Sequence, residues 1–242
     1  MKYDLVLTSC RRNDLLSVTL SSFQKYADIQ PDKVYVIEDS DNYEVEEIVR
    51  AIYPSAIIIN NVPQLGQMKS IRKIYGYSSA DYIFHCEDDW EFFRTGFIAD
   101  SFQLLNVLPK ASLVSLRPRS ELHPLEKSQP KLVTPEGLQY FTADPTSHPE
   151  WFSYSFNPGL RRRADLYEVS DIDSYPSEAE ISLAFKQQGF YLSFLEEPAV
   201  KHIGGGRHVQ DPSRPPKAKT FIARMKRSYR KRMDRLMRRL IG

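Results

Sequence analysis

Blocks of apolar and polar residues alternate along the first hundred positions. Residues 3–8 and 33–38 are short apolar runs typical of buried strands, and each is followed by apolar residues at helical spacing. Asn13 and Asp14 stand where the first helix would begin, which favours a capped start. The same pattern predicts strands over residues 56–60 and 82–86 and helices over residues 44–52, 66–77 and 97–108.

This alternation predicts an α/β fold with a doubly wound, mostly parallel sheet. In such sheets ligands bind beyond the carboxyl ends of the strands. The second half is less regular, with a strand expected over residues 112–116 and a long irregular insertion over residues 117–149, which are rich in Pro, Ser, Glu and Lys. Insertions of that length are often functional. An aromatic strand over 151–156, a helix over 177–188 and a strand over 191–195 complete the pattern.

Composition excludes several classes of protein. Hydrophobic residues make up 41% and charged residues 26% of the 242 positions, close to globular averages, so the chain is neither mostly disordered nor collagenous. Two cysteines cannot form the disulfide framework of a small secreted scaffold. The apolar run at the N-terminus is too short for a secretory signal, and no stretch is long enough to span a membrane. We therefore expect a cytoplasmic location.

Charge divides the chain into an acidic body and a basic tail. The whole chain carries a formal charge of +2, yet residues 217–242 hold 11 basic residues and one acid. Apolar residues recur there at spacings of three and four, which predicts an amphipathic helix over 212–242 that lies on an anionic membrane surface at the inner face of the cell membrane. Dimerisation through its apolar face and RNA binding through its basic face are the competing interpretations.

Three consecutive acids, Glu87, Asp88 and Asp89, follow the apolar strand over residues 82–86. Like charges so close together repel unless a cation or hydrogen-bond donors occupy the site. Oxygen ligands at such a turn suit Mg²⁺ or Mn²⁺, which can also bridge the phosphates of a nucleotide. The alternative is a solvated acidic turn whose side chain caps the next helix.

The segment YIFHCEDDWEF at 82–92 resembles the DxD-type strand end of GT-A glycosyltransferases. Residues 8–12 (TSCRR) and 36–42 (VIEDSDN) are similar to the two nucleotide-contacting loops of family 2-like members, which act in bacterial surface polysaccharide synthesis. SEAEISLAFKQQGF at 177–190 resembles the acidic helix of inverting members, and VKHIGGGRH at 200–208 resembles their late metal-ligand histidine segment. These segments occur along the chain in the expected order.

The resemblance implies roles for individual residues on the donor side. Asp89 would ligate the divalent ion, Glu87 would touch ribose or a metal-bound water, and Asp88 would support them. His202 would complete the metal shell, with His208 as the fallback ligand. The remaining donor-binding residues implied are Thr8, Arg11, Asp39, and, at the start of the helix over 66–77, Gly66 and Lys69.

Transfer with inversion also needs a carboxylate that removes the acceptor proton. Glu178 fits that role at the start of the helix over 177–188, and Glu180 is the second candidate. Residues two apart do not share one helix face, so only one of them should serve, and both could instead be acids favoured by the helix dipole. Trp151 and Asn157 are the acceptor-binding candidates, because aromatic faces stack on sugars. Three arginines, 161–163, are either solvated or bind phosphate.

We therefore expect a metal-dependent glycosyltransferase that moves a sugar from a nucleotide-diphosphate donor, with UDP-sugars favoured, to a glycan or lipid-linked acceptor. The expected organisation is a GT-A catalytic domain over residues 1–211, with a nucleotide-sugar half over 1–110 and an acceptor half over 111–211, followed by the basic helix over 212–242. A retaining transferase and a sugar nucleotidyltransferase stay open, although the latter would carry a glycine-rich loop after its first strand. A membrane or nucleic-acid adaptor acting through the tail is the non-enzymatic alternative, and no nucleic acid is expected to bind the acidic body.

Overall fold

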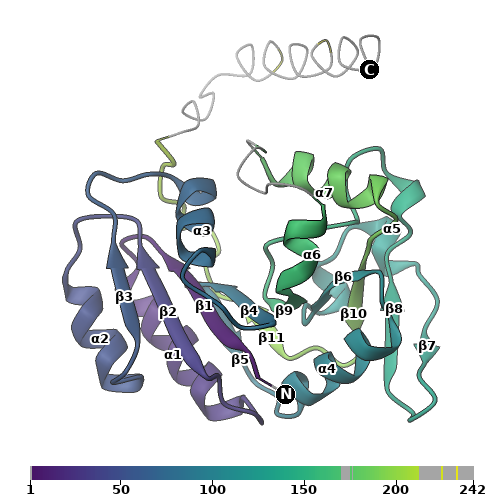
Figure 1. Cartoon of the computed structure of the whole chain (residues 1–242), viewed down its shortest axis with the longest axis horizontal. Helices are drawn as coiled ribbons and strands as arrows, with labels where there is room; N and C mark the ends of the chain where they lie inside the picture. The colour runs from purple at the N-terminus through teal and green to yellow at the C-terminus, as the bar shows by residue number, and fades with distance from the viewer. Residues whose placement is uncertain (1, 170–174, 176, 213–224, 226–232, 234–242) are drawn as a thin grey trace. The chain divides into compact units, whose positions relative to one another are not determined.

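The computed structural model describes residues 2–169, 175, 177–212, 225 and 233. The chain forms two compact units, Met1–Val209 and Gln210–Gly242. All helices and strands described below belong to the first unit (Figure 1). The basic amphipathic helix expected over 212–242 falls almost entirely outside the described residues, so it stays a prediction, as does the domain boundary after residue 211.

The first unit alternates strands and helices as expected. Its strands are β1 (Asp4–Ser9), β2 (Lys33–Glu38), β3 (Ile57–Asn60), β4 (Tyr82–Glu87), β5 (Trp90–Phe92), β6 (Ala111–Ser115), β7 (Leu132–Val133), β8 (Gln139–Thr142), β9 (Gly159–Arg162), β10 (Tyr191–Leu195) and β11 (Val200–His202). Its α-helices are α1 (Asn13–Tyr26), α2 (Glu44–Ile52), α3 (Gln67–Tyr75), α4 (Phe97–Val107), α5 (Pro124–Lys127), α6 (Arg163–Glu168) and α7 (Glu178–Gln187). Short 3₁₀ turns lie at Arg119–Glu121 and Pro145–Ser147.

Nine strands form one mixed sheet in the order β3-β2-β1-β4-β9-β6-β10-β8-β7. The first four run parallel to one another, and β6 and β10 are parallel as well. β9 lies antiparallel between β4 and β6 and joins the two halves of the sheet. A separate two-stranded sheet pairs β11 with β5. The predicted mostly parallel, doubly wound sheet is confirmed, with antiparallel strands at its centre and far edge.

Helices cover both faces of the sheet, because successive residues of a strand point to opposite sides. In β1, Leu5 and Leu7 belong to a core cluster shared with α1, α2 and α4. Val6, between them, belongs to a second cluster shared with α3, α6 and α7. A strand buried on both faces explains the unbroken apolar run in the sequence.

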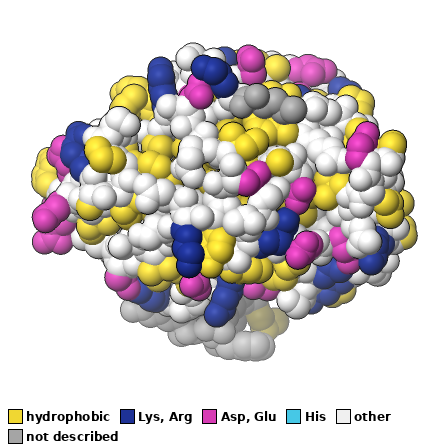
Figure 2. Space-filling view, turned by 90° about the horizontal axis from the view of Figure 1, so that it is seen from below, with side chains coloured by type: hydrophobic (Ala, Val, Ile, Leu, Met, Phe, Trp, Pro, Cys, Tyr) yellow, Lys and Arg dark blue, Asp and Glu magenta, His cyan; other side chains and the backbone are white. Residues whose placement is uncertain are grey.

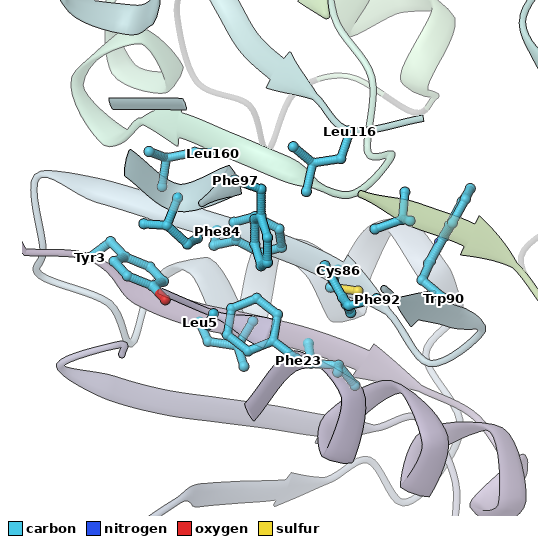
Figure 3. Close-up of a cluster of buried hydrophobic side chains, with 14 of the residues drawn as sticks. Tyr3, Leu5, Phe23, Phe84, Cys86, Trp90, Phe92, Phe97, Leu116 and Leu160 are labelled. Atoms are coloured by element: carbon cyan, nitrogen blue, oxygen red, sulfur yellow. The ribbon is translucent and has the colours of Figure 1, made fainter. Parts of the chain in front are cut away.

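Aromatic rings fill the first cluster, where β1, β4 and α1 meet (Figure 3). Phe23 of α1 lies with its ring centroid 5.0 Å from those of both Phe84 and Phe92. Phe92 stacks on Phe97, with centroids 5.3 Å apart. Edge-to-face and stacked pairs of this kind add to the free energy gained from burial. They fix β4 against α1 and so set where the acidic end of β4 lies.

Three sequence predictions about local structure were wrong. The segment 151–156 is not a strand, although its aromatic residues Tyr154 and Phe156 are buried; the strand lies further on, at β9. The segment 117–149 is not irregular throughout, because it contains α5 and the strands β7 and β8, which are too short for a period to be visible. Asn13 does not cap α1: the N-cap is Arg12, and the Asn13 side chain accepts a hydrogen bond from Asn42 instead.

The surface is mixed in charge on the face shown in Figure 2, where basic and acidic side chains are interspersed rather than gathered by sign. Such a face does not form a broad polyanion-binding surface. Within the described part of the chain, no helix has both the length and the apolar character needed to cross a membrane.

Candidate functional site

The carboxyl ends of β1, β2 and β4 meet at one edge of the sheet. Their register pairs Thr8 with Glu87 and Ser9 with Glu38, so the segments that follow these strands lie side by side. We call residues 8–12, 38–41 and 87–89 the donor edge. Six of the predicted site residues lie there: Thr8, Arg11, Asp39, Glu87, Asp88 and Asp89. The predicted grouping of these residues follows from parallel strands ending together.

Asp88 is fully buried and is held by the loop after β1. Ser9 Oγ and the Cys10 backbone N–H donate to its Oδ2 over 3.0 and 3.3 Å. Arg12 also donates to both oxygens, through Nε at 3.2 Å to Oδ2 and through Nη2 to Oδ1. This carboxylate is therefore a structural support that anchors the β1–α1 loop to the end of β4.

Asp89 has one oxygen engaged and one without a partner. Its Oδ2 accepts from Arg12 Nη1 at 2.7 Å and lies 3.4 Å from His202 Nε2. Its Oδ1 is buried and has no hydrogen-bond partner among the described residues. A buried carboxylate oxygen without a hydrogen-bond partner lowers the stability of the fold. A cation or a hydrogen-bond donor from a ligand would therefore be favoured at this atom.

His202 reaches Asp89 through the small second sheet. β11 runs antiparallel to β5, with His202 opposite Trp90, the residue after Asp89. The His202 ring lies against the Trp90 ring with centroids 4.9 Å apart. Pairing of two segments more than a hundred residues apart in the sequence thus brings the imidazole beside the acid.

Gly204 allows the two segments to approach closely. A Cβ at this position would lie 2.4 Å from Asp89 Oδ2, far inside van der Waals contact. The Ile203 backbone N–H donates to the Asp89 carbonyl over 2.9 Å. No side chain fits at position 204 without moving the Asp89 carboxylate, whereas nothing lies within 4 Å of a Cβ at Gly205.

Burial makes two acids of the donor edge, Glu87 and Asp88, difficult to ionise. Desolvation, together with the charges of Asp89 and Glu178, raises the pKa of Glu87 to about 8. Desolvation also raises the pKa of Asp88 to about 6, although the Arg12 guanidinium opposes that rise. A bound cation would offset this cost, because a nearby positive charge stabilises the ionised form of each carboxylate.

The donor edge fits a divalent ion. Asp89 Oδ1 and His202 Nε2 supply an oxygen and a nitrogen ligand, a combination that suits Mn²⁺ better than Ca²⁺. No group of three or more His, Cys, Asp or Glu side chains with metal-binding geometry occurs among the described residues. The protein would thus provide part of the coordination shell, and substrate phosphates and water the rest.

Asp39, Gly66 and Lys69, the other predicted donor-side residues, lie at the end of β2 and the start of α3. The Asp39 carboxylate accepts from Asn61 Nδ2 and from the backbone N–H groups of Leu65 and Gly66, over 2.8 to 2.9 Å. It therefore fastens the start of α3 to the end of β2. Gly66 has φ 92°, a conformation that favours glycine, and Lys69 is exposed in the first turn of α3. Their roles in donor binding stay predictions.

A second site lies in the other half of the sheet. A cavity of about 480 Å³, which we call the acceptor cavity, is lined by Glu178, Trp151 and Asn157, three of the residues selected from the sequence. Glu178 begins α7, and its Oε1 accepts from Ser155 Oγ and the Phe156 backbone N–H at 2.9 and 3.0 Å. Its charge also contributes to the raised pKa of Glu87, so it lies within electrostatic range of the donor edge. Glu180 is half-buried on the same helix and is not among the residues that line the cavity.

A buried arginine holds the segment that binds Glu178. Arg161 is fully buried in β9 and donates to Tyr154 Oη and to the carbonyls of Ser155 and Asn157 over 2.9 to 3.1 Å. It was expected to be solvated or to bind phosphate; instead its guanidinium is enclosed by protein. Arg162 is engaged as well, with its Nη1 3.1 Å from Asp165 Oδ2.

The sequence analysis did not predict the contacts of two buried or half-buried arginines, Arg12 and Arg161. Arg12 contacts both strand-end acids, but nothing in the pattern of residues 8–12 distinguishes it from its neighbour Arg11, which is exposed and pairs with exposed Asp41. Arg161 is hidden within a run of three arginines that looks solvated. Both contacts depend on which strands pair in the sheet, and neither composition nor the local spacing of apolar residues predicts that pairing.

Comparison with known proteins shows similarity in structure alone. No protein-family model and no curated protein matches the sequence. Among solved structures, residues 1–349 of S. aureus TarS match with a TM-score of 0.60 at 12% identity, over 83% of this chain and 59% of that one. The mannosyltransferase PcManGT from Pyrobaculum calidifontis, in complex with GDP-Man and Mn²⁺, matches with a TM-score of 0.61 at 11% identity, over 85% and 58%. GalNAc-T7 with UDP, GalNAc and Mn²⁺ matches with a TM-score of 0.60 at 13% identity, over 84% and 44%.

These similarities confirm the GT-A fold predicted for the chain. The chain spans less than two thirds of the length of each of these structures.

Proposed function

We propose that the chain is a metal-dependent glycosyltransferase that moves a sugar from a nucleotide-diphosphate donor to a glycan or lipid-linked acceptor. The observation that carries the proposal is the Asp89 carboxylate at the carboxyl end of β4, which lies beside His202 and whose buried Oδ1 has no hydrogen-bond partner in the described part of the chain. The structural neighbours include complexes with UDP-GlcNAc, with GDP-Man and Mn²⁺, and with UDP and Mn²⁺. Donors of this class, with UDP-sugars favoured, fit the predicted role of the donor edge.

On the donor side the chain supplies both binding and charge balance. Asp89 and His202 would hold Mn²⁺ or Mg²⁺, which when bound neutralises the charge of the leaving diphosphate. Arg12 holds Asp88 and Asp89 close together, because it donates to both. Thr8, Arg11 and Asp39 border the same edge and are proposed to contact the nucleoside.

On the acceptor side Glu178 is the proposed general base. Its carboxylate lines the acceptor cavity and is oriented by two hydrogen bonds to Oε1. A carboxylate fixed in this way can take the proton from an acceptor hydroxyl as the new bond to the sugar forms, which supports inversion. Glu178 is favoured over Glu180 because only Glu178 is among the lining residues.

Membrane contact is a separate proposal that concerns residues 217–242. Their 11 basic residues with interspersed apolar positions support binding to anionic lipid at the inner face of the cell membrane. A lipid-linked acceptor of bacterial surface polysaccharide synthesis would then be delivered to the catalytic unit at that surface. Deletion of 217–242 should abolish sedimentation with anionic vesicles and leave soluble donor hydrolysis intact.

The test is a titration of the full chain with UDP-, GDP-, CMP- and dTDP-sugars in the presence and absence of Mn²⁺, which measures donor affinity and slow donor hydrolysis. We expect one nucleotide class to bind in a metal-dependent manner and Asp89→Asn to weaken that binding by at least about tenfold, the worth of one metal or charge-assisted contact. Asp32→Asn is the matched control, because exposed Asp32 pairs with Lys2 just before β2, away from the donor edge.

If no nucleotide binds with metal present, or if Asp89→Asn and Asp32→Asn bind alike, the proposal is wrong. Circular dichroism of both variants separates loss of binding from loss of folding.

A further inference from the structure

Arg161 places a positive charge in the interior of the first unit. Its side chain is fully buried, and among the described residues it donates to Tyr154 Oη and to the carbonyl oxygens of Ser155 and Asn157. The carbonyls are neutral, and burial keeps the Tyr154 hydroxyl neutral because it raises the pKa of that group. A buried charge whose direct partners are neutral needs an opposite charge within electrostatic range.

Glu178 is linked to Arg161 by a single peptide group. The carbonyl of the peptide between Ser155 and Phe156 accepts from Arg161 Nη1 at 3.1 Å, and the N–H of the same peptide donates to Glu178 Oε1 at 3.0 Å. The negative end of the peptide dipole therefore faces the guanidinium, and its positive end faces the carboxylate. Hydrogen bonds in such a chain polarise and strengthen one another.

The Ser155 side chain and the electrostatics of Arg161 support the same link. Ser155 Oγ donates to Glu178 Oε1 at 2.9 Å and accepts from the backbone N–H and the Nδ2 of Asn157 at 3.1 and 2.6 Å. Desolvation opposes the charge of Arg161, whereas neighbouring tyrosines and Glu178 favour it, and the pKa of Arg161 is raised. The guanidinium and the carboxylate thus lie within electrostatic range of each other.

Other charges also act on Glu178. Glu87 of β4 and Glu126 across the acceptor cavity disfavour its ionised form, whereas Arg117 and the start of α7 favour it. The remaining titratable groups around Arg161 and Glu178 are Tyr75, His85, Tyr154, His123 and His148. Burial keeps the two tyrosines and the histidine of β4 uncharged, because it raises the pKa of a phenol and lowers that of an imidazole. Arg161 is the cation that a chain of hydrogen bonds connects to Glu178.

We propose that Arg161 and Glu178 form an ion pair across the Ser155–Phe156 peptide, and that Arg161 is a positioning residue that keeps the proposed base ionised. This inference rests on the proposed function. In that reaction Glu178 takes the proton of the attacking hydroxyl, while the hydroxyl oxygen bonds to the sugar and the bond from the sugar to the diphosphate breaks. Because a peptide separates the two charges, the guanidinium favours the ionised carboxylate without binding it directly.

The test follows the protonation of Glu178 by NMR of the full chain, labelled with carbon-13 at the glutamate carboxyl groups. The Glu178 signal is identified by its loss in Glu178→Gln. Arg161→Gln removes the positive charge and keeps an amide N–H donor, whereas Arg161→Lys keeps the charge. Arg163→Gln is the matched control, because Arg163 Nη2 donates to the exposed Tyr167. Urea unfolding checks that each variant is folded.

We expect Arg161→Gln to raise the pH midpoint of the Glu178 signal by about one, a tenfold change in proton affinity, because the carboxylate loses a nearby opposite charge. Arg161→Lys should restore most of the original midpoint, and Arg163→Gln should leave it unchanged. In the unmodified chain the Ser155 carbonyl and Phe156 amide signals should change with the same midpoint as Glu178, since their peptide lies between the two charges.

The same variants connect the ion pair to the proposed reaction. Donor affinity and slow donor hydrolysis are measured with UDP-, GDP-, CMP- and dTDP-sugars and Mn²⁺. Below the new midpoint, Arg161→Gln should lower kcat of hydrolysis about tenfold and leave KM unchanged, and a higher pH should restore the rate. A purely structural role of Arg161 would lower the rate equally at every pH.

The outcomes separate the two proposals. If the Glu178 midpoint is the same in Arg161→Gln and Arg163→Gln, or if hydrolysis falls equally at every pH, the inference is wrong, and metal-dependent nucleotide binding still supports the proposed function. A raised midpoint in Arg161→Gln without any nucleotide binding supports the ion pair and overturns the proposed function. If Arg161→Gln does not fold, the unmodified chain decides, because a Phe156 amide signal that does not follow Glu178 overturns the inference.

Discussion

At the donor edge the acids Asp88 and Asp89 are bound by the charged side chain of Arg12, whereas at the acceptor cavity Glu178 is bound by a hydroxyl and a backbone N–H. Near the acceptor cavity the buried cation is Arg161. It donates to the Ser155 and Asn157 carbonyls, in the segment that binds Glu178. The first arrangement balances negative charge directly. The second fixes a carboxylate in place through uncharged donors.

The largest expected loss of stability follows from removal of Arg161, next to the acceptor cavity. Arg161→Met should lower the free energy of unfolding by about 3 kcal/mol, because it leaves two buried carbonyls and the Tyr154 hydroxyl without their donor. Urea unfolding measures this loss. Arg163→Met is the control, since Arg163 lies nearer the surface and its Nη2 donates to the exposed Tyr167. If both variants unfold alike, Arg161 does not organise the 154–157 segment.

A smaller effect is expected at the donor edge. Arg12→Met should lower the free energy of unfolding by about 2 kcal/mol, because Asp88 is fully buried and would lose its charged partner while Asp89 stays close to it. Arg11→Met should change stability by less than about 0.5 kcal/mol, since its pair with Asp41 is exposed. Chemical denaturation of the two neighbouring variants gives the comparison, and equal losses would contradict the assigned role of Arg12.

A pair of adjacent glycines tests the geometry of Asp89. Gly204→Ala should cost about 1.5 kcal/mol of stability and weaken metal-dependent nucleotide binding, because the new Cβ displaces the Asp89 carboxylate. The new Cβ of Gly205→Ala meets no described residue within 4 Å, so this variant should leave both quantities unchanged. Thermal unfolding and Mn²⁺ titration measure the difference. Equal behaviour of the two variants would show that Asp89 is free to move and is not held in position by its neighbours.

The smallest effect concerns an exposed pair near the donor edge. Hydrogen bonds from Arg207 lower the pKa of Asp14 to about 2. The group then stabilises the fold above its ordinary pKa near 4 and loses that contribution as the pH falls toward 2. Asp14→Asn should therefore flatten slightly the fall in unfolding midpoint on acidification, as should Arg207→Met. A double variant with twice the effect of either single variant would argue against the pair.

The sequence predicted the donor half well because its signals are local. Apolar runs and helical spacing marked β2 and α2 with the bounds that the structure has, and Asp88 and Asp89 directly follow β4 in the chain. That these acids lie beside residues 8–12 follows from the rule that parallel strands end at one edge.

What could not be predicted depends on contacts between distant segments. The attachment of Arg12 to Asp88 needs β1 and β4 as neighbours, and the burial of Arg161 needs β9 between β4 and β6. His123 and His148 become neighbours only across the Phe152 ring. The short strands β7 and β8 are formed by pairing with each other and with β10, not by a detectable period of their own.

The four-residue strand β9 has a consequence for how the chain folds. It is the strand through which β4 and β6 are connected in the sheet, and it is contributed by a later part of the chain than both. During synthesis, the two halves of the sheet therefore cannot be joined until residues 159–162 have left the ribosome. Folds that depend on such non-local pairing form slowly. We therefore expect a folding intermediate in which the part of the sheet with β1–β4 is ordered and the part with β6 and β10 has not yet joined it through β9.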